Sequence, residues 1–150
     1  MRKIWLIVTL MMFAGCATAQ IPAYLQKKFP YMHRFYADYD KALASLEKTL
    51  ADLGWVIEKQ VDPSVYEEDT QSAPGSKSIL IITEVRQTPL LLGTRYAKMN
   101  IILRSSADVS EIELRYVTVT SLPLKNFVTY KNDSAADRFF GRFDQVLDGK

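Results

Sequence analysis

The chain has 150 residues, of which 48% are hydrophobic and 24% are charged, and this balance excludes both a disordered chain and one embedded in a membrane over most of its length. Nineteen basic and seventeen acidic residues give a formal net charge of +2, which falls to zero once Arg2 and Lys3 are set apart. A neutral chain gives no electrostatic reason to expect nucleic acid as a partner.

The first 15 residues have the pattern of a bacterial export signal. Two basic residues at 2–3 precede an apolar run at 4–14, and small residues follow at 15–17. A helix needs about 20 apolar residues to cross a bilayer, so this run is too short for a permanent membrane span. We therefore expect an exported protein.

Phe13-Ala14-Gly15-Cys16 resembles the lipobox of bacterial lipoproteins, in which an apolar residue, a small residue and Gly or Ala precede the cysteine. The resemblance implies that Cys16 receives a diacylglycerol thioether, becomes the N-terminal residue, and is then acylated on its amine, for example with palmitate. Ala17 after the cysteine resembles lipoproteins sent to the outer membrane, where the protein faces the periplasm. Two or three acyl chains anchor a protein stably.

Two alternatives for this segment stay open. Ala17-Thr18-Ala19 is an A-x-A site, and cleavage after Ala19 would discard Cys16 and release a soluble periplasmic protein. Cys16 would otherwise be a chance residue of the apolar run. It is the only cysteine, so we expect no internal disulfide.

A short tether is predicted between the signal and the folded part. Residues 17–28 show no sustained period, which predicts a flexible segment of about twelve residues with a root-mean-square span of roughly 20 Å. We thus expect a signal at 1–15, a lipidated N-terminus and tether at 16–29, and a single domain at 30–148.

The domain is expected to open with a strand and a helix. An aromatic strand is predicted at 31–37, and Asp38 follows as a helix N-cap. Apolar residues then recur on one helical face until Gly54, which predicts a helix stopped by a left-handed glycine. This face is formed by Tyr39, Ala42, Leu43, Leu46, Leu50 and Leu53.

Four strands are predicted next, at 55–61, 78–86, 94–104 and 111–120, with a long acidic connection at 62–76 and a looser one at 89–93. The last two strands alternate apolar and polar residues, which predicts an antiparallel sheet with one face on a core and one largely solvated. On the solvated face we expect ordinary charge pairs formed by Glu111, Glu113 and Arg115.

A closing helix completes the pattern. Asn132-Asp133-Ser134 supplies its cap, and its apolar face consists of Ala136, Phe139, Phe140, Phe143, Val146 and Leu147. The order β-α-β-β-β-β-α predicts a two-layer α+β domain, in which two helices pack on one face of an antiparallel sheet of about four to five strands.

This order behind a lipobox resembles the helix-grip domains of the BamC family, accessory lipoproteins of the outer-membrane β-barrel assembly machinery. The resemblance covers about residues 31–147. It rests on Leu53-Gly54-Trp55 leading straight into a strand, on paired strands at 96–103 and 112–119, and on residues 130–133 leading into the last helix. BamC carries two such domains and this chain one, so the resemblance implies the fold more than a role in barrel assembly.

The sequence offers little catalytic chemistry. His33 is the only histidine and lies on a short aromatic strand, which favours packing over catalysis. Motifs for a serine nucleophile, phosphate, dinucleotide and a zinc protease do not occur. The acidic run 67–69 lacks the alternate spacing of calcium loops. We therefore expect a non-enzymatic protein without cofactor or metal.

An apolar and aromatic loop is predicted at 122–130, and such a loop is costly to leave in water. Its residues Leu122, Leu124, Phe127 and Tyr130 form the candidate surface for binding another envelope protein.

Two further functions remain as alternatives. A continuous apolar cavity between Leu46, Phe139 and the sheet would favour a module that binds a lipid-like or apolar small molecule. Acidic residues that converge in a cleft would favour a small envelope hydrolase.

Overall fold

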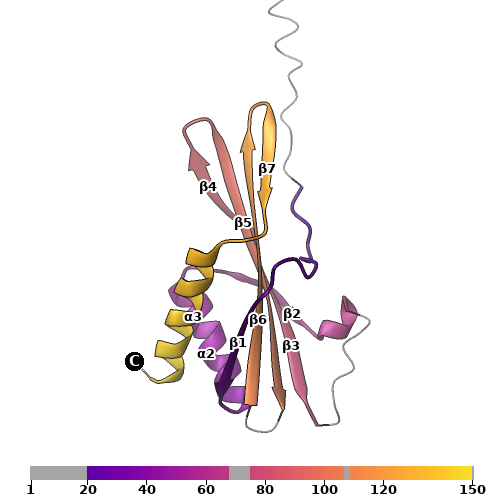
Figure 1. Ribbon diagram of the computed structural model, residues 1–150, viewed down its shortest axis with the longest axis vertical. Helices are drawn as coiled ribbons and strands as arrows, with labels where there is room; N and C mark the ends of the chain where they lie inside the picture. The colour runs from indigo at the N-terminus through magenta and orange to yellow at the C-terminus, as the bar shows by residue number, and fades with distance from the viewer. Residues whose placement is uncertain (1–19, 68–74, 107–108, 150) are drawn as a thin grey trace, which may run out of the picture.

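The described part of the chain forms one antiparallel sheet and two α-helices, which confirms the expected α+β class. The computed structural model describes residues 20–67, 75–106 and 109–149 (Figure 1). Within these ranges the sheet has seven strands rather than the expected four to five. In chain order the elements are β1 (Tyr31–Tyr36), α2 (Tyr39–Asp52), β2 (Ile57–Val61), the 3₁₀-helix η1 (Pro63–Val65), β3 (Lys77–Thr83), β4 (Arg86–Leu90), β5 (Gly93–Ser106), β6 (Val109–Leu122), β7 (Lys125–Thr129) and α3 (Asp133–Leu147).

The sheet is built around its two long strands, β5 and β6. Each has 14 residues, and they pair from Thr94↔Ser121 to Ser106↔Val109. One half of this pair lies inside the five-stranded order β1-β6-β5-β3-β2, and the other half carries β4 on β5 and β7 on β6. We call this second half, made of hairpins β4-β5 and β6-β7, the hairpin end. It projects beyond both helices (Figure 1).

The hairpin end accounts for the extra strands. A loose connection is predicted at 89–93 and a loop at 122–130, whereas both segments belong to hairpins. Proline is normally evidence against a strand, and Pro89 lies within β4. It is tolerated because β4 is an edge strand that pairs, among the described strands, with β5 alone.

The first helix confirms its predicted boundaries. The Asp38 side chain accepts a hydrogen bond from the backbone N–H of Lys41 at 2.8 Å, as an N-cap does. At the other end Gly54 has φ of +70°, a conformation that glycine adopts without steric cost. The backbone N–H of Trp55 then donates to the carbonyl of Leu50 at 2.8 Å, which closes the helix and directs the chain into β2.

Both helices pack on the same face of the five-stranded part (Figure 1). Their apolar stripes and the inward side chains of β3, β5 and β6 form a single core, which agrees with the predicted helical faces. The fully or almost fully buried apolar residues of the helices are Ala42, Leu46, Leu50, Ala136, Phe139 and Phe143.

The opposite face of the sheet is covered too, so the prediction of a largely solvated face is wrong. Residues 20–30, which we call the strap, lie against it. Leu25 of the strap is 1% exposed and packs with Val117 and Val119, while Tyr24 packs on a second cluster that includes Ile102. The strap therefore differs from the flexible tether predicted at 17–28, because a lack of periodicity does not reveal the burial of an irregular segment.

Candidate functional site

The hairpin end exposes large apolar side chains at its two turns. Leu91 and Leu92, in the β4-β5 turn, are 98% and 71% exposed, and Leu124, in the β6-β7 turn, is 98% exposed. The turns are neighbours, because a Cβ added to Gly93 at one of them would lie 2.0 Å from the carbonyl oxygen of Ser121 at the other. Exposed apolar groups gathered in this way mark interaction sites.

Strand β7 adds apolar side chains along an edge of the sheet. Among the described strands it pairs only with β6. Phe127 and Val128 lie on opposite faces of β7 and are 48% and 52% exposed. An unpaired edge of this kind is a template for pairing with another chain.

The structure exposes two of the four side chains predicted for partner binding, Leu124 and Phe127. Leu122 is half-buried beside Gly93. Tyr130 is half-buried against the Leu25 cluster, and the Nζ atom of Lys28 lies 4.7 Å from the centre of its ring.

Sequence reasoning missed Leu91, Leu92 and Val128. A signal for the first two was present, since the apolar run 90–92 is bracketed by Pro89 and Gly93 and so must lie in or near a turn. No sequence signal marked Val128, because it belongs to β7, a strand that the sequence did not predict.

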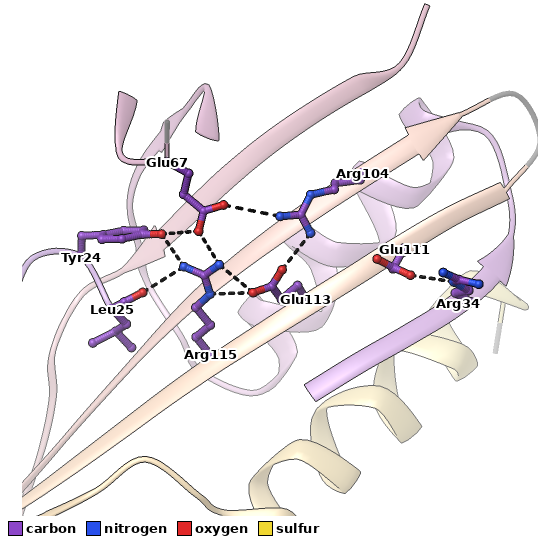
Figure 2. Close-up of polar contacts among 8 residues, drawn as sticks. All are labelled: Tyr24, Leu25, Arg34, Glu67, Arg104, Glu111, Glu113 and Arg115. Carbon is purple, nitrogen blue, oxygen red and sulfur yellow. Dashed lines mark hydrogen bonds and ion pairs between the residues drawn. The ribbon is translucent and has the colours of Figure 1, made fainter. Parts of the chain in front are cut away.

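A buried network of charges lies on the strap-covered face (Figure 2). Arg115 and Glu113 project from β6 with side chains 1% and 0% exposed, and Arg115 Nε donates to Glu113 Oε1 at 2.7 Å. Arg104 of β5 donates to the other oxygen of Glu113 at 2.8 Å. Glu67, which follows η1, accepts hydrogen bonds from Arg115 and Tyr24 and lies 3.6 Å from Arg104.

This network fastens the strap to the sheet. Arg115 donates to the Tyr24 hydroxyl and, at 3.1 Å, to the backbone carbonyl of Leu25. With its amide oxygen turned toward the strap, Asn100 accepts from the backbone N–H of Leu25 at 2.8 Å. Both backbone polar groups of Leu25 therefore have partners, as a buried segment outside regular structure requires.

The surroundings fix the protonation states in the network. Burial raises the pKa of Tyr24 to about 12, and its hydrogen bond to Glu67 acts in the same direction. Burial alone would raise the pKa of Glu67, but hydrogen bonds from Tyr24 and Arg115 and the charges of Arg115 and Arg104 outweigh burial and lower it. Glu67 is thus ionised at neutral pH, which suits an ion network rather than proton transfer.

The prediction of ordinary surface pairing is wrong for Glu113 and Arg115, which the strap shields from water. It does describe Glu111, whose Oε2 lies 2.6 Å from Nε of Arg34 on β1 (Figure 2). The Arg34 side chain is 78% exposed. Alternation along β6 places all three side chains on one face but does not say which part of that face is covered.

His33 connects β1 to α3. Its Nε2 atom lies 2.8 Å from Oδ1 of Asp144, and its ring stacks on Phe140 with centres 4.9 Å apart. Tyr31 on the same strand donates to Asp133 at 2.9 Å and accepts from the backbone N–H of Asn132 at 2.8 Å. These contacts dock the closing helix against the edge of the sheet.

A cleft of about 240 Å³ opens where the end of α2 meets the start of α3. Arg86 and Arg138 line it, together with Trp55 and Tyr116. The guanidinium of Arg86 stacks on Trp55 at 4.4 Å from the ring centre. This lining is partly charged, and it differs from the apolar cavity between Leu46 and Phe139 that would favour a lipid-like ligand; both of those residues are packed in the core.

Within the described ranges no group of three or more His, Cys, Asp and Glu side chains is placed to hold a metal ion. None of the helices there combines the length and the apolar character that a membrane crossing requires. Cys16 and the acidic residues 68–69 lie outside the described residues.

A scan against protein-family models and a search of curated proteins found no match to this chain.

Proposed function

We propose that this protein is a non-enzymatic lipoprotein of the bacterial envelope, anchored through lipid on Cys16 to the outer membrane and facing the periplasm, and that it binds another envelope protein along β7. The observation that carries the proposal is the concentration of exposed apolar side chains at the hairpin end. A lipid anchor and an apolar binding surface together describe an accessory protein of the envelope.

The short distance along the chain between Cys16 and the strap determines how close an anchored body would lie to the membrane. Gln20 begins the described part, and four extended residues span at most about 14 Å. From Ile21 onward the strap packs on the sheet. A lipid on Cys16 would therefore hold the folded body next to the bilayer.

The geometry of β7 supports binding of an extended segment. A peptide that adds to a sheet edge gains main-chain hydrogen bonds, and its specificity comes from side chains on alternate positions. Phe127 and Val128 present apolar groups on the two faces of this edge. A partner strand with apolar side chains on both faces fits it best.

Polar side chains that often serve catalysis have other contacts here, which supports a non-enzymatic role. His33 is within hydrogen-bond distance of Asp144, and its ring stacks on Phe140 and lies near Phe35. Glu67 and Glu113 do converge, but on Arg104 and Arg115, which neutralise both. Two carboxylates compensated in this way are poor general acids and bases.

For the fold we propose the helix-grip arrangement of the BamC family. The direct passage from α2 through Gly54 into β2, and the docking of α3 on the same sheet face, support it. The hairpin end contains the two strands, β4 and β7, that the β-α-β-β-β-β-α order expected from the sequence does not include.

Cys16→Ala is expected to move the protein from the membrane fraction to the soluble fraction, or to block cleavage of the signal, because the thioether cannot form. Fractionation of cells and the intact mass of the purified protein measure both effects. Ala19→Leu is the matched control: it spoils the A-x-A site and leaves the lipobox intact, so we expect normal processing. The opposite pattern, in which Ala19→Leu blocks processing and Cys16→Ala does nothing, would refute lipidation.

A photoreactive residue placed at Phe127 or Val128 is expected to give the same discrete protein adduct in intact cells, because both side chains lie on the proposed binding strand. Val56 is the control, since it is 56% exposed and lies just before β2, outside β7. Adducts that are absent from β7, or equally strong at Val56, would count against a partner on this edge.

A further inference from the structure

We propose that the hairpin end docks on the anionic surface of the same membrane that holds the lipid anchor, with the leucine turns of β4-β5 and β6-β7 inserted among the headgroups. This inference rests on the proposed anchor at Cys16 and deepens it, because it adds a second contact that sets how the body stands on the bilayer. The β7 edge then remains available to a protein partner.

The first observation is the apolar character of both turns. Leu91, Leu92 and Leu124 are among the most exposed large side chains of the described residues, and they share one end of the sheet. Figure 1 shows that neither helix reaches this end. Apolar side chains at a bilayer interface lie about 5–10 Å deep, at the boundary between headgroups and acyl chains. Side chains at the tips of projecting hairpins can reach this depth while the rest of the body stays in water.

The second observation is the charge of the strap and of the segments that form the two hairpins. Residues 20–30, 86–98 and 116–131 contain seven basic residues and no acidic one, so all seventeen acidic residues lie elsewhere, against ten of the basic residues that follow Cys16. Basic side chains near a membrane surface are attracted by anionic lipids. The seven are Lys27, Lys28, Arg86, Arg95, Lys98, Lys125 and Lys131.

Most of these charges are available to a surface. Lys98 pairs with Glu58 at 2.8 Å, Lys131 pairs with Asp133 at 3.4 Å, and Arg86 donates to the backbone carbonyls of Leu53 and Gly54. The other four have no acidic partner among the described residues. Arg95 and Lys125, which are exposed, lie closest to the leucine turns along the chain. The hairpin end thus combines exposed leucines at its turns with the basic side chains of Arg95 and Lys125 close to them.

The third observation is where the chain enters the fold. The strap begins beside β7 (Figure 1), and Ile21 packs on the cluster that contains Val119, whose pairing partner in β7 is Val128. Cys16 lies within about 14 Å of Gln20. A lipid on Cys16 therefore enters the bilayer near the end of the molecule that carries the leucine turns.

Because of the anchor, even a weak contact between the leucine turns and the membrane is sufficient to orient the protein. Once Cys16 is in the membrane, docking of the turns is an intramolecular step, and a short link gives an effective concentration in the millimolar range. Three leucines and a few basic residues need not be strong enough to bind an unanchored protein to vesicles. They are sufficient to hold an anchored protein in a fixed orientation.

The test uses the full chain, purified from membranes and reconstituted into vesicles that contain anionic phospholipid. An environment-sensitive fluorophore is attached to Leu91→Cys or Leu124→Cys, and Val109→Cys is the matched control at the opposite end of the β5-β6 pair, where the side chain is 43% exposed. We expect a blue shift and strong quenching by bilayer-embedded quenchers at positions 91 and 124, and neither at 109.

Removal of charge tests the second observation. Arg95→Gln and Lys125→Gln are each expected to lower the ratio of docked to undocked molecules about fivefold, as loss of one basic residue near an anionic surface should. Vesicles of zwitterionic lipid alone should give a similar loss in the unsubstituted chain. Equal quenching in both vesicle types would overturn the anionic part of the proposal.

The anchor and the docking can fail separately. The chain without an added cysteine should take up no fluorophore, since the Cys16 sulfur is a thioether, and its intact mass should include acyl chains. An acylated protein whose labels at 91 and 124 resemble the label at 109 overturns the docking and leaves the anchor standing. A mass without acyl chains overturns the anchor, and with it the docking built on it.

Discussion

Replacement of Arg115 by methionine is expected to destabilise the protein by about 3–5 kcal/mol, the range found when one member of a buried ion pair is removed. Glu113 is fully buried and would keep Arg104 as its cationic partner, while Glu67 would lose its closer cation. The strap would also lose the donor that holds the carbonyl of Leu25. The midpoint of urea unfolding, with the slope unchanged, measures the loss.

Arg34→Met is the matched control. It makes the same chemical change in an ion pair on the same sheet face (Figure 2), but the Arg34 side chain is 78% exposed and that of Glu111 is 22% exposed. Exposed ion pairs contribute little, so the midpoint should scarcely move. Losses of similar size in the two variants would show that burial under the strap does not set the strength of the network.

A double substitution separates charge from packing. Arg115→Met combined with Glu113→Gln should lose less stability than Arg115→Met alone, because Arg115→Met leaves Glu67 and Glu113 to share the single positive charge of Arg104 and the second substitution removes one of these two carboxylates. An equal loss in the single and the double variant would instead assign the effect to packing of the arginine side chain.

The helices could be predicted closely because their signals are local. Asp38 and Gly54 mark the ends of α2 within a few residues of its apolar stripe, and Asn132 caps α3 in the same way. The α+β class follows from these helices and from the alternating pattern of β5 and β6. None of these inferences needs knowledge of distant contacts.

The covered face of the sheet could not be predicted, because its cause is distant in sequence. Tyr24 and Arg115 are hydrogen-bonded to each other although 91 positions separate them in the sequence. Nothing in the composition of the strap indicates that it covers the sheet. A charged residue at an alternate strand position has the same pattern whether water or a strap lies above it. The sequence therefore places Arg115 on the correct face and in the wrong environment.

The hairpin end was predictable in part. The segment 122–130 drew attention because its apolar residues follow no period, and the structure does expose Leu124 and Phe127 there. Its strand character was hidden by Pro123, and that of β4 by Pro89. Both prolines are compatible with hairpins because they lie in a turn and on an edge, which depends on pairing that the local sequence does not reveal.

Leu25→Ala is expected to cost about 2–4 kcal/mol, because the side chain is 1% exposed and its loss leaves a cavity against Val117 and Val119. The same change should free the strap, so trypsin should cleave after Lys27 and Lys28 faster than in the unsubstituted chain. Urea unfolding and limited proteolysis measure the two effects.

Phe29→Ala is the control in the same segment, since that ring is 69% exposed and its removal should leave both measurements nearly unchanged. If Leu25→Ala behaved like Phe29→Ala, the strap would be a loose tether, and the folded body would hang farther from the bilayer than four residues allow. The position of the hairpin end at the membrane therefore depends on how firmly one leucine is buried.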